Sequence, residues 1–383
     1  MKKNYFLTIL LISVSGIAQI PLNYYSSATG TGYALKTQLK TIITNGHVDK
    51  GYGSGTNQTN NGLWSAYGTT DRDNGIGYEN DNTIVDIYSE NPTGVDSYNF
   101  NFNTASGGNN GQCGTYSIEG NCYNREHLIP QSYFGGTGIM RNDVQHIYPT
   151  DGKVNAIHND FAFGKVGVPS VVSLNGSKLG SALNSGYSAG FTGTVFEPID
   201  EFKGDVARVY FYFATRYEDQ MATFYTNYPT PDCRVMFDGT ANQVFSPTFL
   251  NILLTWNAQD PVSTKEVLRN NASYIHQGNR NPYIDNNSYL TTIWGSPLSL
   301  DSFELNSNIN IFPNPTSSNN VNITSDVIIE SIELININGQ IIRKIENPSF
   351  ENKTYQLTDL TRGFFFLKIK SDNQFVTKKI MVN

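Results

Sequence analysis

Residues 121–166 of this chain read NCYNREHLIPQSYFGGTGIMRNDVQHIYPTDGKVNAIHNDFAFGKV. This stretch holds three of the five histidines of the chain, together with three aspartates and one glutamate. Its piece CYNREHLI has the character of a strand, and KVNAIHNDF favours a helix with Asn155 and Asn159 on one face, four residues apart. We therefore expect a strand and a helix to bring polar side chains together here and to organise the fold around them.

The residue types in this stretch suit metal-assisted hydrolysis of a phosphodiester. An imidazole titrates near neutral pH and can accept a proton from water, which makes His127 the candidate base. The oxygens of Glu126 and Asn155 suit a hard cation such as Mg²⁺. Successive side chains of a strand face opposite sides, so Glu126 and His127 point apart unless a bulge re-aims one of them. We expect a metal to lie between the strand and the helix. His127 is then expected to contact the attacking water on the other side of the phosphate.

The same stretch resembles the bacterial endonuclease I / extracellular nuclease family, whose catalytic core is a ββα-metal (His-Me) finger. The resemblance rests on NREH, on the Pro-x-Ser-[Trp/Tyr]-Phe run that follows and on DVQHIYPTDGKVN. It continues in GDVARVYFYFATRY (204–217), in WNAQDPV (256–262) and in QGNRNPYID (277–285), so that it covers nearly all of residues 20–295.

Carried over residue by residue, the resemblance implies that His127 is the general base and that Glu126 and Asn155 hold the metal. The ion would be Mg²⁺, with Mn²⁺ and Ca²⁺ as alternatives, and the substrate DNA, with RNA as a further substrate. Family logic also implies products that carry a 5′-phosphate. The chain departs from the family pattern at Gln145, where a second histidine is usual, and at His158, where an arginine is usual.

An arginine is expected to secure the phosphate, and Arg141 and Arg280 are the two candidates. Arg280 lies in an Asn- and Gly-rich loop, which suits contacts of backbone and guanidinium with phosphate. His146 is expected to orient a neighbour or to pack within the finger rather than to react. Asp260 and Asp285 are expected to cap or brace loops.

The charge balance counts against a general nucleic-acid-binding surface. The chain carries a net charge of −7, and residues 19–300 hold 16 basic and 24 acidic residues. A non-specific binder of nucleic acid normally profits from a basic face. Attraction must therefore come from a local cluster of Arg and Lys and from a bound cation.

Two alternatives from other classes remain open. The acidic balance and the His158 departure fit a secreted binding or surface protein on an inactive nuclease scaffold, although the intact core residues speak against it. A phosphodiesterase or phosphatase for small substrates would show a closed, nucleotide-sized pocket. A long groove flanked by Arg141 and Arg280 would favour cleavage of a polymer.

The N-terminus predicts a secretory signal peptide over residues 1–18. Lys2 and Lys3 form a basic start, Tyr5 to Val14 is mostly apolar, and small residues stand at the two positions that determine cleavage. The apolar run is too short to span a bilayer, and no other segment approaches about 20 apolar residues. We expect a soluble, secreted protein without a membrane span, and a monomer.

Residues 19–300 are predicted to form the α+β nuclease domain. The run GYGSGTNQTNNG (51–62) is typical of a linker, and Ser263 with Glu266 has the spacing of a capping box. On the amphipathic helix near its middle, Arg208 is expected to pair with Asp205. The regular elements expected here are helices over 33–44, 202–216, 251–256 and 264–275 and a strand, TIVDIYSE, over 83–90.

Residues 308–383 alternate in short period-two runs, which predicts an all-β sandwich of roughly seven strands with a hairpin at Asn338-Gly339. The boundary is expected between Ser296 and Asn308. IFPNPT, LTDLTRGFFFLKIK and the terminal basic patch resemble the sorting domain of the type IX secretion system. That resemblance implies the type IX machinery as a partner and an extracellular or cell-surface destination. An ordinary carbohydrate-binding or adhesive module is the alternative.

The chain has three cysteines. An oxidising destination favours a disulfide between Cys113 and Cys122, which would brace the chain just before the candidate site. Their spacing fits no zinc pattern. Cys233 is left over, either as a small buried apolar residue or as a free thiol.

Overall fold

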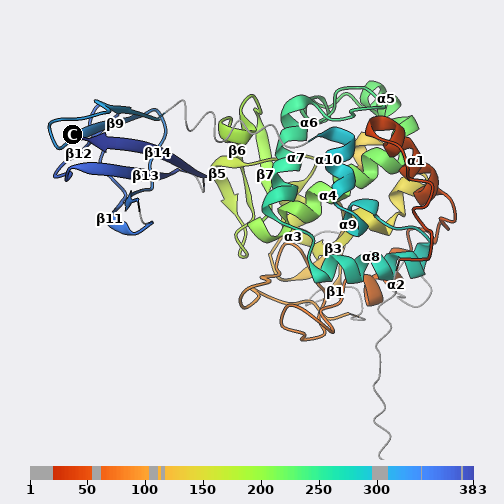
Figure 1. The fold of residues 1–383 in the computed structure, drawn as a ribbon. Helices are drawn as coiled ribbons and strands as arrows, with labels where there is room; N and C mark the ends of the chain where they lie inside the picture. The colour runs from red at the N-terminus through yellow and green to blue at the C-terminus, as the bar shows by residue number, and fades with distance from the viewer. Residues whose placement is uncertain are drawn as a thin grey trace, which may run out of the picture. The chain divides into compact units, whose positions relative to one another are not determined.

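A computed structural model describes residues 20–53, 62–102, 111–113, 117–295, 309–337, 339–371 and 374–383. The chain divides into two compact units (Figure 1), one of residues 1–182 and 193–295 and one of residues 183–192 and 296–383. The predicted signal peptide, most of the predicted linker at 51–62 and Asn338 lie outside the described residues.

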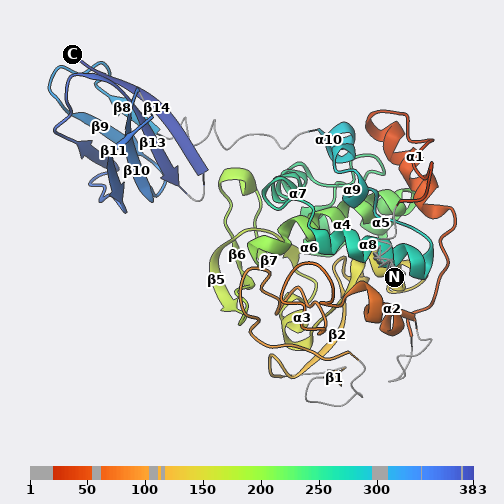
Figure 2. The same cartoon turned by 60° about the horizontal axis from the view of Figure 1, so that its bottom comes forward.

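Helices make up most of the regular secondary structure described in the first unit, and α4 lies at its centre (Figure 2). Every residue of α4 is buried, because its sequence is apolar or aromatic on several sides, and α1 and α7 pack against it. The helices are α1 (Gly32–Thr44), α2 (Gly62–Thr70), α3 (Gly152–His158), α4 (Lys203–Arg216), α5 (Glu218–Asn227), α6 (Pro231–Met236), α7 (Pro247–Gln259), α8 (Thr264–Gln277), α9 (Pro282–Asp285) and α10 (Ser288–Trp294).

The helices expected from periodicity are present. α1, α4 and α8 lie within two residues of the predicted bounds. Ser263 Oγ accepts a hydrogen bond from the Glu266 backbone, and the Glu266 carboxylate accepts one from the Ser263 backbone, so the predicted capping box is confirmed. α7 is longer than predicted because Ser246 caps it and Pro247 starts it one turn earlier.

The decisive stretch forms two antiparallel strands followed directly by a helix. β2 (Cys122–His127) pairs with β3 (Ile147–Asp151) in an unbroken register from Tyr123↔Asp151 to His127↔Ile147. β1 (Gly111–Gln112) adds a short parallel edge to β2. The Asp151 carboxylate accepts a hydrogen bond from the Val154 amide at 2.8 Å and so starts α3 directly after β3. The result is a ββα finger.

A second sheet in this unit has the order β4-β7-β6-β5. It follows the finger in sequence and adds further strands to the mixed α+β unit. Its strands are β4 (Ala162–Phe163), β5 (Val166–Val172), β6 (Lys178–Ala182) and β7 (Thr194–Glu197).

The predicted strand at residues 83–90 is wrong. Only an isolated bridge from Arg72 to Ile84 forms there, and the chain turns at Asp86. The buried Asp86 carboxylate accepts hydrogen bonds from the Tyr88 amide at 2.9 Å and the Ser89 hydroxyl at 3.0 Å. An aspartate whose side chain accepts hydrogen bonds from the residues that follow it favours a turn over a strand. The alternating apolar residues around Asp86 favour a strand, and the turn prevails.

α3 is also shorter than predicted. It ends at His158, and Asn159 follows in the left-handed region with φ of 50°. Asn159 therefore caps the helix, and it does not share a helical face with Asn155.

The second unit contains the predicted β-sandwich. Its sheets have the orders β11-β10-β13-β14 and β12-β9-β8, and β10 and β11 form the predicted hairpin. On β13, Phe365 is buried while Phe364 and Phe366 are exposed, as alternation requires. The seven strands described are β8 (Ile309–Phe312), β9 (Val321–Ser325), β10 (Ser331–Asn336), β11 (Ile341–Glu346), β12 (Thr354–Leu357), β13 (Gly363–Ser371) and β14 (Gln374–Val382).

The predicted disulfide between Cys113 and Cys122 is present, and it ties the chain to the start of β2. Cys233 is a buried free cysteine, and burial raises the pKa of its thiol to about 11. None of the helices in the described ranges is long and apolar enough to cross a membrane.

Candidate active site

The two faces of β2 carry different chemistry. Asn124 and Glu126 face α3, where Asn124 Oδ1 lies 2.7 Å from Asn155 Nδ2. Arg125 and His127 project to the opposite side, where both lie against the ring of Tyr52. The β2–β3 register shows no bulge that would re-aim either side chain. The finger therefore places the candidate ligands on one face and the candidate base on the other.

Glu126 is almost fully buried at 3% exposure, yet its carboxylate has partners. Oε1 accepts a hydrogen bond from the Tyr88 hydroxyl at 2.7 Å and lies 2.5 Å from Nδ1 of His158. His158 is on α3, so this contact ties the second strand of the sheet to the helix that follows β3. Tyr88 and His158 orient the carboxylate from two sides.

Asn155 and Glu126 each offer an oxygen atom of the kind that suits a divalent cation. The Asn155 amide uses its nitrogen to donate to Asn124, so its oxygen is the atom that it can offer to a metal. A carboxylate oxygen from β2 and an amide oxygen from α3 are hard ligands of the kind that Mg²⁺ prefers. The residues on this face of the finger are therefore chemically suited to the expected ion.

His127 is held in one tautomer by the chain around it. Its Nε2 lies 3.2 Å from the Arg141 carbonyl, which can only accept, so Nε2 carries the proton and Nδ1 keeps the lone pair. Nδ1 lies 3.5 Å from the Gln131 amide nitrogen. Burial, and then the nearby His146, lower the pKa of His127 well below its usual value. The ring is therefore neutral near pH 7, the state that a general base needs.

Two guanidinium groups share the Tyr52 ring beside His127. The Arg125 guanidinium carbon lies 3.4 Å from the ring centroid and that of Arg141 lies 3.9 Å from it. Arg141 is half-buried, and its Nε also donates to Gln131 at 3.2 Å. These two arginines form the local positive cluster that the acidic chain requires. Arg125 and Tyr52 are not among the candidates expected from the sequence, although Arg125 stands inside the NREH motif.

Arg280 does not lie in this cluster, and its contacts give no support to its expected role as a phosphate clamp. It is 1% exposed, and its Nε and Nη2 donate to the two carboxylate oxygens of Asp285 at 2.6 and 2.7 Å. Nη2 also donates to Asn271. A buried guanidinium already paired with a carboxylate stabilises the loop and offers no accessible face to a phosphate.

The other singled-out residues are structural. His146 is fully buried, and its Nε2 lies 2.6 Å from the Met140 carbonyl, so it packs in the finger as expected. Gln145 donates to Asn270 at 3.0 Å and braces α8. Arg208 contacts Asp205 at 3.5 Å and pairs more closely with Glu266 at 2.6 Å. Asp260 and Asp285 brace loops as expected, through the Gly204 amide and Arg280.

A ββα finger with a buried histidine at the end of its first long strand is the core of nucleases of the ββα-metal class. Residues 31–288 match the endonuclease I family, and residues 310–383 match the secretion system C-terminal sorting domain. The chain belongs to the endonuclease I family.

Two curated relatives are similar over most of the chain. The extracellular ribonuclease of Bacillus amyloliquefaciens is 32% identical over 277 residues, which cover 71% of this chain and 78% of the relative. The extracellular ribonuclease of Bacillus subtilis (strain 168) is 31% identical over the same shares of the two chains. This protein is a secreted hydrolase that acts on phosphodiester bonds.

Proposed function

We propose that the protein is a metal-dependent endonuclease that cleaves DNA and also RNA, with His127 as general base and Glu126 and Asn155 as metal ligands. The observation that carries the proposal is the hydrogen bond from His127 Nε2 to the Arg141 carbonyl. It leaves the lone pair of the neutral ring on Nδ1, beside two arginines. The bound Mg²⁺ would polarise the phosphate and stabilise the leaving 3′ oxygen.

The arrangement of the two faces sets a condition on the substrate. The hydrogen bonds and ring contacts described for Glu126 and for His127 involve no common residue, because β2 turns the two side chains apart. His127 is the last residue of β2. The phosphate must therefore lie across the end of this strand, where it can reach both side chains. His127 takes the proton from water on one side of it.

Arg141 is the proposed phosphate-binding residue, together with Arg125. Both guanidinium groups lie beside the base on the Tyr52 ring, so a phosphate that approaches His127 meets positive charge. The Tyr52 ring restricts the rotamers of both side chains, which lowers the entropy lost when they bind. The family name and the ribonuclease relatives support a polymeric nucleic-acid substrate.

The small-substrate alternative has less support. A cavity of about 320 Å³ lies beside β3, and its lining includes Tyr148, Asp205, Glu266 and Arg269. Glu126, His127 and Asn155 are absent from that lining, and its three acidic side chains balance its three basic ones, so it offers no net positive charge to a phosphate. This cavity therefore lacks the groups needed for a phosphatase.

Digestion of supercoiled plasmid and of RNA by the secreted protein tests the proposal. We expect nicking of both with Mg²⁺, none with EDTA, and 5′-phosphate ends on the products. His127→Ala should lower the rate by about 10²–10⁴-fold. His276→Ala, on α8, is the matched control and should keep wild-type activity. Full plasmid nicking by His127→Ala would refute the mechanism.

The proposal extends to the processing of the chain. We propose a signal peptide over 1–18, a nuclease domain over 19–300 and a sorting domain over 308–383 that the type IX secretion machinery engages. We also propose that the mature enzyme is a monomer. Mass spectrometry of the secreted protein would give both ends of the mature chain, and light scattering on a sizing column would give its mass in solution.

A further inference from the structure

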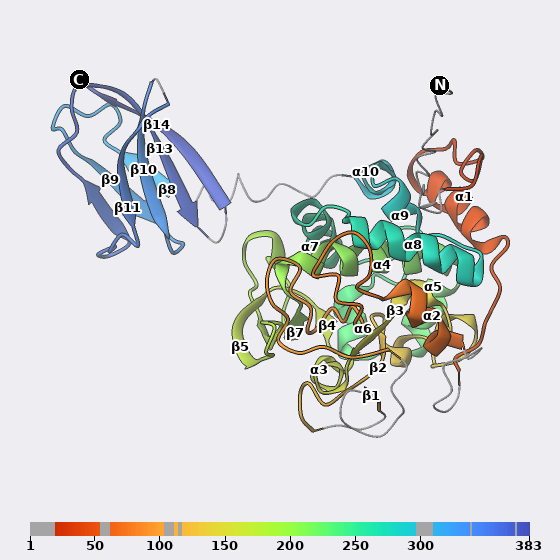
Figure 3. The same cartoon turned by 90° about the horizontal axis from the view of Figure 1, so that it is seen from below.

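The acidic charge of the protein is concentrated in one irregular segment. Residues 71–102 contain seven acidic residues and one basic residue, in a chain whose net charge is −7. Figure 3 shows this segment, in orange, running as loops without a helix or strand. A loop of this length and charge repels itself, so something must compensate for the charge where the carboxylates meet.

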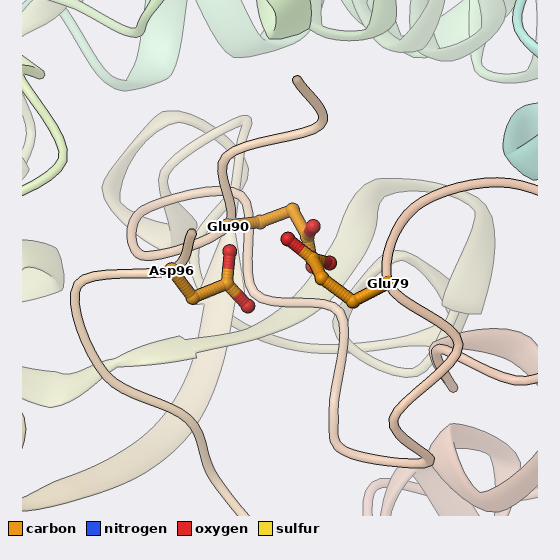
Figure 4. Close-up of side chains that lie close together, drawn as sticks. All are labelled: Glu79, Glu90 and Asp96. Atoms are coloured by element: carbon orange, nitrogen blue, oxygen red, sulfur yellow. The ribbon is translucent and has the colours of Figure 1, made fainter. Parts of the chain in front are cut away.

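Three of these carboxylates converge. The ligand atoms of Glu79, Glu90 and Asp96 lie within 4.8 Å of one another, and Figure 4 shows the three side chains pointing toward one another from different parts of the loop. We call them the acidic cluster. Glu79 is exposed, Asp96 is half-buried and Glu90 is 1% exposed. One side of the cluster is therefore open to solvent, and the other reaches into the protein.

Glu90 is the unexplained member of the acidic cluster. Both of its carboxylate oxygens are buried, and neither has a hydrogen-bond partner among the described residues. A buried carboxylate without hydrogen bonds or a counter-charge costs several kcal/mol. Lys265, the nearby cation on α8, is already paired with Asp73 at 2.6 Å. Asp96, by contrast, has a partner, because it accepts a hydrogen bond from the Asn91 amide at 2.7 Å.

We propose that the acidic cluster is a second divalent-metal site, separate from the catalytic finger, and that it binds Ca²⁺ through Glu79, Glu90 and Asp96. Three carboxylates on a loop can bind in mono- or bidentate fashion and leave room for water on the exposed side, which suits Ca²⁺. Mg²⁺ demands a stricter octahedral arrangement and gives up its water reluctantly. The extracellular destination of the protein also favours a site of modest affinity, with a Kd of about 10⁻⁴–10⁻³ M.

The site would hold the loop that supports the catalytic finger. Two residues before Glu90, the Tyr88 hydroxyl donates to Glu126 at 2.7 Å. Four residues before Glu90, the Asp86 carboxylate accepts a hydrogen bond from the Asp151 amide at 2.8 Å, at the start of α3. An ion on Glu90 therefore fixes the turn that orients the proposed metal ligand Glu126.

A shared proton is the competing account of the acidic cluster. Burial, and then the charges of Asp96 and Glu79, raise the pKa of Glu90 to about 9, so without an ion this carboxyl would hold a proton at neutral pH. A proton satisfies one oxygen of Glu90, whereas a cation satisfies all three carboxylates. The two accounts differ in whether added Ca²⁺ binds and stabilises the protein.

The test uses the full secreted chain, freed of metal with EDTA and then dialysed. Titration calorimetry and thermal unfolding are recorded with CaCl₂ and, separately, with MgCl₂. The Glu126→Gln protein removes the proposed catalytic ligand, so binding that persists in it belongs to another site. We expect Glu126→Gln to keep a Ca²⁺-dependent rise in Tm of about 3 °C at 10 mM. Adding Glu90→Gln should weaken Ca²⁺ binding more than about tenfold and abolish the rise.

The stability of the single variant Glu90→Gln relative to the wild type should depend on whether Ca²⁺ is present. In EDTA it should be at least as stable as the wild type, because it removes a buried carboxyl that without an ion must take up a proton or stay charged without a partner, and in Ca²⁺ it should be less stable. Glu201→Gln, an exposed glutamate on another segment, should follow the wild type in both conditions. Ca²⁺ binding that Glu90→Gln leaves unchanged would overturn the proposal. So would equal destabilisation of Glu90→Gln with and without Ca²⁺, or tighter binding of Mg²⁺ than of Ca²⁺ at this site.

Discussion

His158 Nδ1 lies 2.5 Å from Oε1 of Glu126, and both side chains are buried. The other ring nitrogen, Nε2, lies 3.0 Å from the Phe161 carbonyl. The ring of His158 is therefore held between α3 and the chain that follows it, with Nδ1 directed at the Glu126 carboxylate. It makes this contact at the position where the family usually has an arginine.

We expect His158→Ala to raise the Mg²⁺ concentration needed for half-maximal nicking by about 10- to 100-fold. The change removes the donor that orients the proposed metal ligand Glu126 and leaves this buried carboxylate with only the Tyr88 hydroxyl described as a donor. The measurement is plasmid nicking over a series of Mg²⁺ concentrations.

His158→Arg is the matched control, because its guanidinium supplies a donor to Glu126 and is the side chain usual in the family at this position, and we expect a Mg²⁺ dependence close to that of the wild type. Tyr88→Phe removes the other hydrogen bond to Glu126 and should have an intermediate effect. An unchanged Mg²⁺ dependence in His158→Ala would mean that this contact does not act on metal binding.

Arg141→Ala should lower kcat/KM on plasmid DNA by about 10- to 100-fold, the loss of one charge-assisted phosphate contact of roughly 1.5–3 kcal/mol. Its Tm should change little, because the side chain is half-buried and its described partners are the Tyr52 ring and Gln131. Steady-state kinetics at two salt concentrations would measure the change. If Arg141→Ala cleaved DNA as well as the wild type, the phosphate contact would have to come from Arg125.

Arg280→Ala should give the opposite pattern. It leaves the Asp285 carboxylate buried without its bidentate partner, which costs about 3–5 kcal/mol of the free energy of unfolding. Below the new Tm, the KM for DNA should stay at the wild-type value. Denaturant unfolding and initial-rate kinetics on the same preparation separate the two quantities. A raised KM in a protein of unchanged stability would restore Arg280 as a phosphate-binding residue.

The pH dependence of stability should reflect His146. Burial lowers its pKa in the folded protein, whereas the unfolded chain takes up the proton near pH 6.5. The unfolded state therefore binds more protons as the pH falls below about 6.5, and the folded state loses up to about 1.4 kcal/mol per pH unit. Urea unfolding between pH 5 and pH 8 should show a shallower slope for His146→Gln than for the wild type.

Phe134→Leu provides the control for this slope. Phe134 packs against the His146 ring with 6.1 Å between centroids, so the change lowers stability in the same cluster without removing a titrating group. Its stability should fall by a similar amount at every pH. Equal slopes for His146→Gln and the wild type would contradict the assignment.

The parts of the fold that the sequence predicts are those set by local chemistry. Ser263 and Glu266 are three residues apart, and their capping box depends on nothing else in the chain. The strands of the sorting domain follow from alternation, which also decides that Phe365 is buried and Phe364 exposed. The turn at Asp86 is also set by local hydrogen bonds, but the apolar residues around it alternate as in a strand and so predict the wrong element.

The parts that could not be predicted depend on partners distant in sequence. Arg125 joins the candidate site because it donates to the Tyr52 carbonyl, 73 residues earlier, and stacks on that ring. No local pattern in the sequence marks a contact between residues so far apart. The acidic cluster is similar, since Glu79, Glu90 and Asp96 converge only through an irregular loop. Arg280 is different, because its partner Asp285 is only five residues away, yet the spacing does not reveal that the two side chains are buried together.

The Cys113–Cys122 disulfide should contribute stability without taking part in catalysis. It closes a short loop with a sequence separation of 9, which corresponds to about 2–3 kcal/mol of the free energy of unfolding. Cys122 begins β2, whereas Glu126 and His127 end it. The paired change Cys113→Ala and Cys122→Ala should therefore lower the urea midpoint and keep the rate of plasmid nicking at 25 °C.

Reduction provides an independent version of the same test. Dithiothreitol should lower the urea midpoint of the wild type to that of the double variant and leave the double variant unchanged. Cys233→Ala should respond to dithiothreitol as the wild type does, because Cys233 is a buried free cysteine outside the bond. If the double variant folded normally but lost nicking activity, the disulfide would be positioning the catalytic end of β2 rather than stabilising the chain that leads into it.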